Sequence, residues 1–385
     1  MGNKNLKPKP AIDPEEYKQY DDIYSEPIKK EDHDTFYEIK KEWGSPGDDD
    51  LYEVTHKIDS DEKEKNKKFL IKCNIRYGQI KEYNEDTHQS LSFFKKIKIK
   101  RHVYSYLYFL NDGRLAANWD RELKIYSKDF KKIEQKFKNK SSYISQLKDN
   151  SLINCSFNEV DIFKYNEKNK KFIYNFTLKC ISYAIKVIEL PNEGLAILAD
   201  NISIYSKQNE IYKKEGKELH IITMDDMILI NDNEIASISS QESTITFWDL
   251  KTREINAQIG NIENFGHSCL LLYDKNLIVG GANTDFTKNS AKFIYIINIE
   301  NKEFIKQYLF RQNIWCMTKL NDKEFFTGET NGIINRYRYE DDELKLIETN
   351  KEHGKETIMN ITFSKNNNQL ATLDENQIVI FNMSE

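Results

Sequence analysis

Cysteine and histidine are scarce in this sequence, and neither is arranged for cross-linking or metal binding. Its 385 residues contain five cysteines, an odd number, scattered from position 73 to position 316 and never spaced as CxxC. The seven histidines are never two or four residues apart. Disulfide frameworks need paired cysteines, and structural zinc sites need closely spaced thiolates or imidazoles. We therefore expect free thiols and no metal.

Long apolar runs are also lacking. No stretch approaches the roughly 18 apolar residues that cross a bilayer, and none follows a basic N-terminus as in a signal peptide. Gly2 is the position at which N-myristoylation would occur, but Leu6 stands where that pattern has Ser or Thr. We expect a soluble, cytoplasmic protein without lipidation at Gly2 and without a membrane partner.

The common catalytic motifs are missing as well. The chain has no GxxxxGK[ST] to cradle phosphates, no HExxH, no GxSxG and no GxGxxG after a strand. We therefore expect no enzyme activity, no catalytic residues, no cofactor and no small-molecule substrate.

Proline is confined almost entirely to one end of the chain. Five of the six prolines lie in residues 1–50, which also hold eight lysines and fourteen acidic residues, a net charge of −6. Since the whole chain carries −5, residues 51–385 sum to about +1. Such a segment buries too little apolar surface to offset its ordering entropy. We expect a disordered acidic tail over residues 1–33, either a partner-binding arm or a solubilising tail, and a single domain over residues 34–385.

What the chain does contain is an internal repeat. Each unit has a turn with Asp or Asn, a short apolar strand, a polar turn and an alternating strand that ends in an aromatic residue, as in DGRLAANWDRELKIY from Asp112. The offsets between the seven units are 37, 43, 40, 42, 48 and 45 residues. This period is typical of four-stranded propeller blades, and the alternation of β-branched and aromatic residues predicts strands. A more charged fourth strand follows each aromatic end, as expected of an outer edge.

The fourth unit resembles the WD40 repeat. It has His220 before its first strand, a second strand of small residues, and the closing pair Trp248-Asp249. Elsewhere the closing residue is Tyr or Phe. In that family such polar residues form a hydrogen-bond network within a blade. The same role is expected here for the histidines that precede first strands, which are His102, His220, His267 and His353.

The number of blades depends on whether the segment before the seven clear repeats forms a further blade. Seven units run from Val103 to the C-terminus, and a seven-bladed ring would close by pairing residues 92–100 with the last unit. Residues 67–83 also fit the template, however, with residues 51–58 as a first strand. Residues 35–40 would then complete an eighth blade by pairing with residues 377–382. The sequence favours eight blades over seven with an appended hairpin.

Two basic clusters are candidates for nucleic-acid binding. Residues 95–101 place lysines on alternate positions, and residues 336–339 read Arg-Tyr-Arg-Tyr. Phosphate binding needs a concentrated basic face. The first cluster is equally typical of a charged edge strand, and the second is followed at once by four acidic residues. We expect no nucleic-acid partner.

The resemblance to WD40 proteins implies a non-enzymatic scaffold or adaptor that binds other proteins. Partners would dock on the face made by loops that enter first strands or join second to third strands. Aromatic and arginine side chains are frequent interface anchors, and those loops offer Arg101, Trp119, Arg121, Phe265, Phe286, Arg311 and Trp315. Trp119 and Trp315 would equally suit strand packing, and Phe286 lies in the longest insertion, residues 282–292. A structural subunit of a cytoskeletal or ciliary assembly is one alternative. A propeller enzyme with its active site on the ring axis is another, and it would need acidic side chains or histidines from several repeats to converge.

Overall fold

The computed structural model describes residues 51–54, 73–78, 81–82, 91–99, 106–119, 122–138, 141–180, 182–219, 224–239, 242, 244–260, 267–273, 275–282, 292–310 and 312–384. These residues form 31 strands, β1–β31, and one short 3-10 helix, Thr330–Gly332 (η3). Within these ranges no helix is long and apolar enough to cross a membrane. The fold is therefore all-β, as the sequence predicts.

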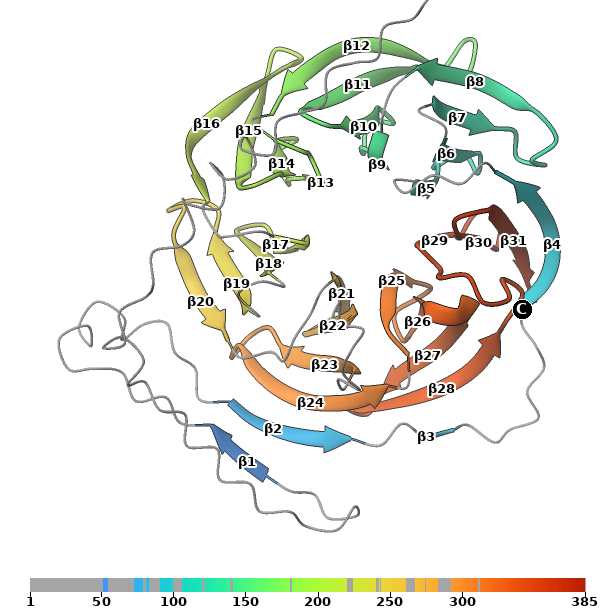
Figure 1. Ribbon diagram of the computed structural model, residues 1–385. Coiled ribbons are helices and arrows are strands. Elements are labelled where there is room, and N and C mark those ends of the chain that lie inside the picture. The colour runs from blue at the N-terminus through green and yellow to red at the C-terminus, as the bar shows by residue number, and fades with distance from the viewer. Residues whose placement is uncertain are drawn as a thin grey trace, which may run out of the picture.

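Seven antiparallel four-stranded units, here called blades 1 to 7, form a ring (Figure 1). Blade 1 contains β5 (Tyr106–Phe109), β6 (Leu115–Trp119), β7 (Glu122–Tyr126) and β8 (Ile133–Lys138). Blade 2 contains β9 (Ser141–Gln146), β10 (Leu152–Ser156), β11 (Glu159–Asn166) and β12 (Lys171–Lys179). Blade 3 contains β13 (Lys186–Glu189), β14 (Leu195–Leu198), β15 (Ile202–Gln208) and β16 (Ile211–Leu219).

The other half of the ring repeats this order. Blade 4 contains β17 (Asp226–Asn231), β18 (Glu234–Ser239), β19 (Thr244–Asp249) and β20 (Ile255–Ile259). Blade 5 contains β21 (His267–Tyr273), β22 (Asn276–Ala282), β23 (Lys292–Asn298) and β24 (Glu303–Phe310). Blade 6 contains β25 (Ile314–Lys319), β26 (Glu324–Glu329), β27 (Ile334–Glu340) and β28 (Glu343–Asn350). Blade 7 contains β29 (Asn360–Ser364), β30 (Gln369–Leu373), β31 (Gln377–Met383) and β4 (Leu91–Lys98).

Blade 7 closes the ring by joining two distant parts of the chain. Its fourth strand is β4, which pairs antiparallel with β31 in a register that sets Ser92 opposite Asn382 and Lys98 opposite Gln377. The prediction of eight blades is therefore wrong. The last strand of the propeller already has a partner, so it has no open edge for residues 35–40, which lie outside the described ranges.

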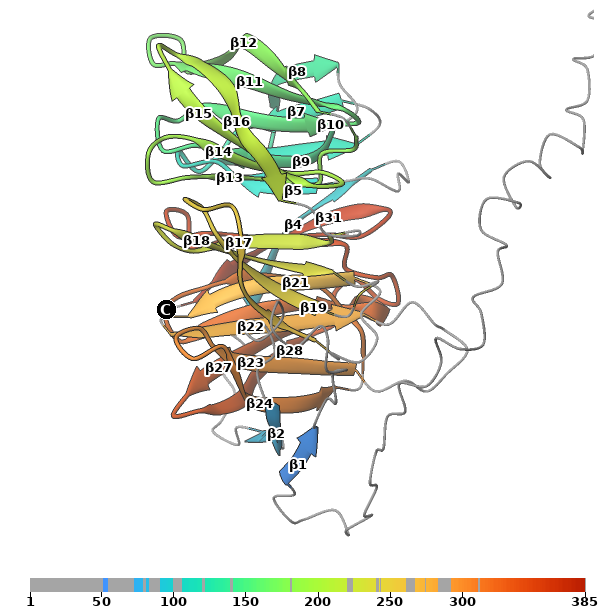
Figure 2. The ribbon, with the colours of Figure 1, turned by 90° about the vertical axis from the view of Figure 1, so that its left-hand side faces the viewer.

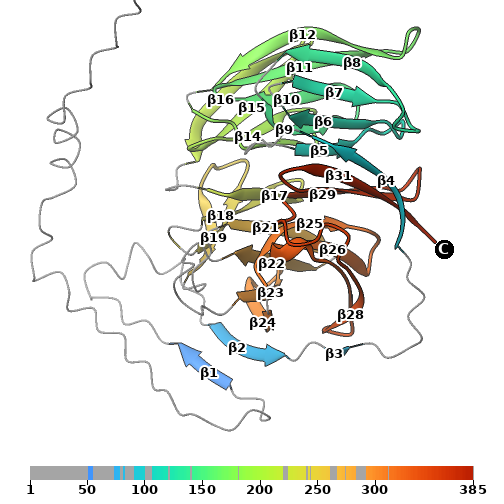
Figure 3. The same cartoon turned by 45° about the vertical axis from the view of Figure 1, so that its right-hand side comes forward.

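The segment assigned to an eighth blade instead extends two existing sheets. β1 (Leu51–Val54) and β2 (Cys73–Gly78) form a hairpin, and β2 pairs in parallel with β24 through Tyr77 and Gly78. β3 (Lys81–Glu82) pairs in parallel with β28. Figure 2 shows β1 and β2 beyond β24, and Figure 3 shows β3 beside β28, both outside the ring. The template match failed because strand alternation shows that a segment is extended but not which sheet it joins.

Apolar side chains fill each contact between neighbouring blades. Seven buried clusters occur among the described residues, and each one joins a pair of adjacent blades. The cluster between blades 7 and 1 places Leu107 and Trp119 against Ile378 and Ile380. A fully buried aliphatic side chain contributes about 1.5–3 kcal/mol. Seven filled contacts for seven blades are what a closed ring requires, since an open ring leaves one cluster without its partner.

The Asp or Asn that opens each repeat has a local cause. In blades 1, 2 and 3 its side-chain oxygen accepts a hydrogen bond from the backbone N–H two residues later, in the turn between first and second strands, at Asp112, Asp149 and Asn192. In blades 4 and 6 the Asn just before it, Asn231 or Asn321, accepts the same kind of bond. These Asx turns set the tight reversal that joins the two strands. The sequence period is therefore a period of turns as well as of strands.

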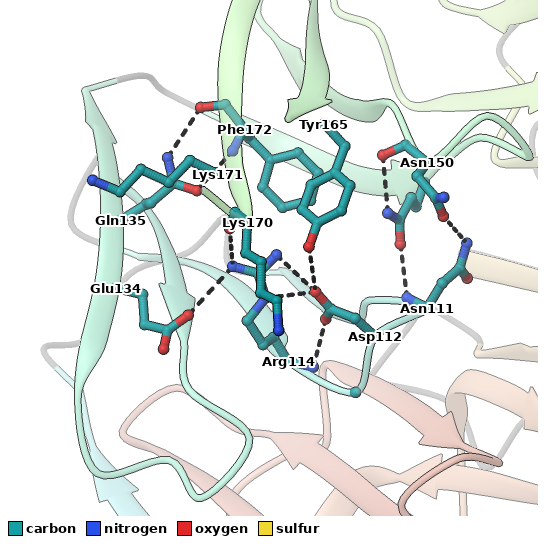
Figure 4. A network of polar contacts seen from close by, with 12 residues as sticks. Asn111, Asp112, Arg114, Glu134, Gln135, Asn150, Tyr165, Lys170, Lys171 and Phe172 are labelled. Atoms are coloured by element: carbon teal, nitrogen blue, oxygen red, sulfur yellow. Dashed lines mark hydrogen bonds and ion pairs between the residues drawn. The ribbon is translucent and has the colours of Figure 1, made fainter. Parts of the chain in front are cut away.

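Blades 1 and 2 are also joined by a buried arginine (Figure 4). Arg114 is 4% exposed, and its Nε donates to Asp112 Oδ2 at 2.8 Å within blade 1. Its Nη1 donates to the backbone oxygen of Lys170 at 2.9 Å in blade 2. The guanidinium lies beside the neighbouring rings of Tyr165 and Phe172, 5.6 Å and 5.4 Å from their centroids. The charge is thus paired, hydrogen-bonded and within cation–π distance of two rings, as suits a buried charge.

Candidate interaction surfaces

The connections of each blade alternate between the two ends of its strands, so the ring has two faces. One face, here called the loop face, carries the connections between second and third strands and those that lead into the next blade. In blade 2 the two kinds touch: Cys180 N–H donates to the Asn158 carbonyl at 2.7 Å, and Ala184 N–H donates to the Phe157 carbonyl at 3.2 Å. The opposite face carries the tight Asx turns.

Most anchors predicted from the sequence lie outside the described ranges. This holds for Arg101, Arg121, Phe265, Phe286 and Arg311, and also for Gly2, for residues 1–33 and for most of the insertion at residues 282–292. Their role in partner binding stays a prediction.

The two tryptophans of that set are placed. Trp119 is 8% exposed, stacks on Tyr126 with ring centroids 5.6 Å apart, and has the Lys124 ammonium 4.2 Å from its ring centroid. Strand packing is therefore its role in this structure. Trp315 lies half-buried in β25, the innermost strand of blade 6. The structure does not bring these two side chains together, since they belong to blades 1 and 6.

Sequence reasoning missed an aromatic pair on the loop face. Phe157 occupies the two-residue turn between β10 and β11 and is 58% exposed. Tyr183, in the segment leading to blade 3, lies edge-on to it, with ring centroids 5.5 Å apart. Polar or glycine residues are usual in such a turn, so a phenylalanine there was the available signal. The two hydrogen bonds to the carbonyls of this turn hold the backbone that carries the exposed ring.

The innermost strands bring several ionisable side chains near the ring axis. Lys186 Nζ lies 2.6 Å from Asp226 Oδ1 across blades 3 and 4, and the rings of Tyr106 and Tyr143 are 4.9 Å apart across blades 1 and 2. Burial raises the pKa of both tyrosines well above the ordinary value of 10.0. The hydroxyls stay protonated at neutral pH and the charges are paired. The chemistry of this cluster is that of a clamp between strands, without an activated base or nucleophile.

The thiols follow the same pattern. Cys155 and Cys316 are free and buried, and burial is the main cause that raises the pKa of each above the ordinary value of 9.0. A thiol is reactive as the thiolate, so these two are inert packing groups. Among the residues that the structure describes, no group of three or more His, Cys, Asp or Glu side chains could hold a metal ion.

The histidine before blade 7 confirms the expected network within a blade. His353 Nδ1 is 2.6 Å from Asp374 Oδ2, and its Nε2 is 2.6 Å from Thr372 Oγ1. All three residues are buried. In blade 4 the other half of such a network is present, because Trp248 Nε1 donates to Ser237 Oγ at 2.9 Å. His102 and His220 lie outside the described ranges, as does the side chain of His267.

The second basic cluster is neutralised inside its own blade. Arg336 and Arg338 each place Nη2 2.6 Å from a carboxylate oxygen of Glu324, which is buried. Burial alone would raise the pKa of Glu324, but the two guanidinium groups hold it below the ordinary value of 4.5. Both guanidinium groups are thus held by a carboxylate of their own blade. Residues 95–98 of the first cluster lie in β4, the charged edge strand anticipated from its alternation.

Comparison with known proteins supports the fold and nothing finer. No family model matches the sequence, and no curated protein matches it. In shape the chain is similar to a chain in the crystal structure of the mitotic checkpoint complex, with a TM-score of 0.64 and 12% identity, over 79% of this chain and 95% of that chain. As many as 1369 solved chains match in shape, so the architecture is widespread and does not itself identify a function. The chain is a seven-bladed β-propeller.

Proposed function

We propose that this protein is a non-enzymatic scaffold that binds other proteins through the loop face, with Phe157 as an anchor. The observation that carries the proposal is an aromatic ring that is mostly exposed to water, on a turn whose two backbone carbonyls both accept hydrogen bonds. Rigid aromatic side chains lose little entropy on binding and dominate interface energies. Tyr183 beside it enlarges the apolar target.

The chemistry at the axis supports the non-enzymatic part of the proposal. The buried tyrosines have raised pKa values and the Lys186–Asp226 pair is internally neutralised. A general base needs a pKa near the working pH, and a nucleophile needs an activating partner. Neither condition is met by these side chains.

The test compares Phe157→Ala with Ile211→Ala in the full chain. Ile211 is 57% exposed and lies just after the turn at residues 208–210, at the opposite face. Partners would be recovered by affinity purification from the source cells, identified by mass spectrometry, and their binding re-measured with purified components. We expect Phe157→Ala to weaken the main partner at least tenfold and Ile211→Ala to leave it unchanged, with equal melting temperatures. Equal affinities for the two variants would rule out an anchor at Phe157.

A further inference from the structure

The outer rim of the ring has a covered part and an open part. β2 and β3 pair in parallel with the outer strands of blades 5 and 6, through Tyr77 opposite Gln307 and Lys81 opposite Lys345. The chain itself therefore shows that fourth strands of this propeller accept an added strand. In the described residues of blades 7, 1, 2, 3 and 4, by contrast, the sheets end at β4, β8, β12, β16 and β20. These five blades are consecutive in the ring (Figure 1).

Large apolar side chains are exposed on the open part of the rim. Seven such side chains are exposed among the described residues, and all but Phe157 lie on these outer strands, namely Phe93, Phe94, Ile133, Ile173, Tyr174 and Ile211. None of the seven lies on the covered strands β24 and β28, or on the open strand β20. Single exposed apolar residues such as Ile211 are ordinary, but neighbouring ones on an uncovered strand, as on β4 and β12, indicate a contact surface.

β4 combines this apolar surface with charge of one sign. Phe93 is 53% exposed and Phe94 is 43% exposed. The strand also carries Lys95, Lys96 and Lys98 and has no acidic residue. Lys95 donates to the Phe130 carbonyl of blade 1 at 2.6 Å.

Two of these lysines are available for a partner. Lys96 and Lys98 are exposed and, two residues apart, lie on the same face of the strand. Lys96 lies 3.6 Å from Glu352, but both side chains are more than one-third exposed. Such a pair contributes little and exchanges readily with another carboxylate.

Edge protection explains the lysines but not the phenylalanines. Lysine on an edge strand repels a second basic or neutral strand and so prevents self-association. Phe94 lies edge-on to Phe130 of blade 1, with ring centroids 6.1 Å apart, but both it and Phe93 remain largely exposed, where a purely protective edge would carry polar residues. Together, the lysines and exposed rings of β4 disfavour binding of a basic strand and favour binding of an acidic strand that also carries apolar residues.

We propose that the outer edge of β4 binds an extended acidic segment of a partner protein by strand addition. The backbone of the segment pairs with the outward N–H and C=O groups of β4, as β2 pairs with β24. Its carboxylates pair with Lys96 and Lys98, and its apolar side chains cover Phe93 and Phe94. This surface is on the rim and is independent of the loop face, so the scaffold has two separate docking sites.

The experiment measures binding of a fluorescent eight-residue peptide of alternating Glu and Val to the full-length protein by anisotropy. We expect saturable binding that weakens at least tenfold in Lys96→Glu/Lys98→Glu and in Phe93→Ser/Phe94→Ser. The matched control is Lys136→Glu/Lys138→Glu, which makes the same charge change on exposed residues of β8 and should bind as the unmodified protein does. Melting temperatures show that each variant is folded.

Four outcomes would overturn the proposal. Equal weakening by the β8 control would show diffuse electrostatic attraction. Unchanged binding of a peptide N-methylated on alternate residues would exclude strand addition. If the peptide binds only after Asp48, Asp49 and Asp50 of this chain are replaced by Asn, the edge of β4 belongs to the chain's own acidic segment and not to a partner. If the protein does not bind the peptide but binds vesicles containing phosphatidylserine, and Lys96→Glu/Lys98→Glu abolishes that binding, the edge of β4 is a membrane-binding surface.

Discussion

A single hydroxyl orients the tryptophan that carries the WD40 resemblance. Trp248 is 3% exposed, and its ring fills the contact between blades 3 and 4. Its indole N–H would be unsatisfied there without Ser237 Oγ, 2.9 Å away. Ser237 of the second strand thus satisfies the indole N–H of the large residue of the third strand.

Replacing Trp248 should therefore be costly. We expect Trp248→Ala to lower the free energy of unfolding by about 3–5 kcal/mol through the cavity that it leaves. Ser237→Ala leaves the buried indole N–H of Trp248 without its acceptor and should lower the free energy of unfolding by about 1–3 kcal/mol. Chemical denaturation monitored by circular dichroism measures both. A near-neutral Trp248→Ala would mean that this ring does not pack between blades.

The network of His353 makes one part of the stability depend on pH. Burial alone would raise the pKa of Asp374, but hydrogen bonds from His353, the Asn376 N–H and Gln377 hold it below the ordinary value of 3.8. A carboxyl whose pKa is lower in the folded state stabilises that state above its unfolded pKa. The contribution is lost as the pH falls through the folded value.

Asp374→Asn should remove that pH dependence. The difference in unfolding free energy between the unmodified protein and the variant should be largest near about pH 7 and should shrink below about pH 4. There the carboxyl is protonated first in the unfolded state and then, at lower pH, in the folded state. Denaturation curves at a series of pH values test this. A difference that stays constant down to about pH 3 would show that Asp374 stabilises the blade only by its shape.

Among the elements, the strands of the repeats followed directly from the sequence. Alternation with period two, closed by an aromatic residue, placed the second, third and fourth strands of the blades where the structure has them, because each strand has one face in each neighbouring contact. Residues 51–83 were correctly read as containing strands but were given the wrong neighbours. Pairing between distant segments depends on which edge is open, and local pattern carries no information on that.

The loop face was the harder part to predict. Trp119 is of a residue type that often anchors interfaces, but it is the last residue of the buried strand β6 and serves in packing. Phe157 was overlooked because short turns are usually polar. Residue type ranks candidates for binding, whereas exposure decides among them, and exposure depends on the turn that holds the side chain.

Contacts between blades are polar as well as apolar, and Arg114 is the clearest case. Arg114→Met keeps the apolar stem against Tyr165 and Phe172 but removes the donors to Asp112 and Lys170. We expect a loss of about 1.5–3 kcal/mol, the usual range for hydrogen bonds to a charged group. Lys132→Met is the matched control, since Lys132 also approaches Glu134 but is largely exposed. Equal stability of the two variants would show that this contact does not depend on the guanidinium.

For the molecule as a whole, seven units and one borrowed strand make a closed ring. The chain begins its propeller with the outer strand of the last blade, so the two ends of the domain hold each other. This arrangement leaves no unpaired terminal blade, which in a ring of sheets would be a site of aggregation. It also frees the residues before β4 to extend blades 5 and 6 from outside.

The closure can be measured by cross-linking β4 to β31. Ser92 and Asn382 lie directly opposite each other, and opposite Cα atoms in an antiparallel pair are about 4.5–5.5 Å apart, within the range that a disulfide spans. In Ser92→Cys/Asn382→Cys, mild oxidation followed by peptide mapping should recover the linked peptides in high yield, while Phe36→Cys/Asn382→Cys should give none. A link from position 36 to position 382, with none from position 92, would contradict the seven-bladed ring and restore an eighth blade.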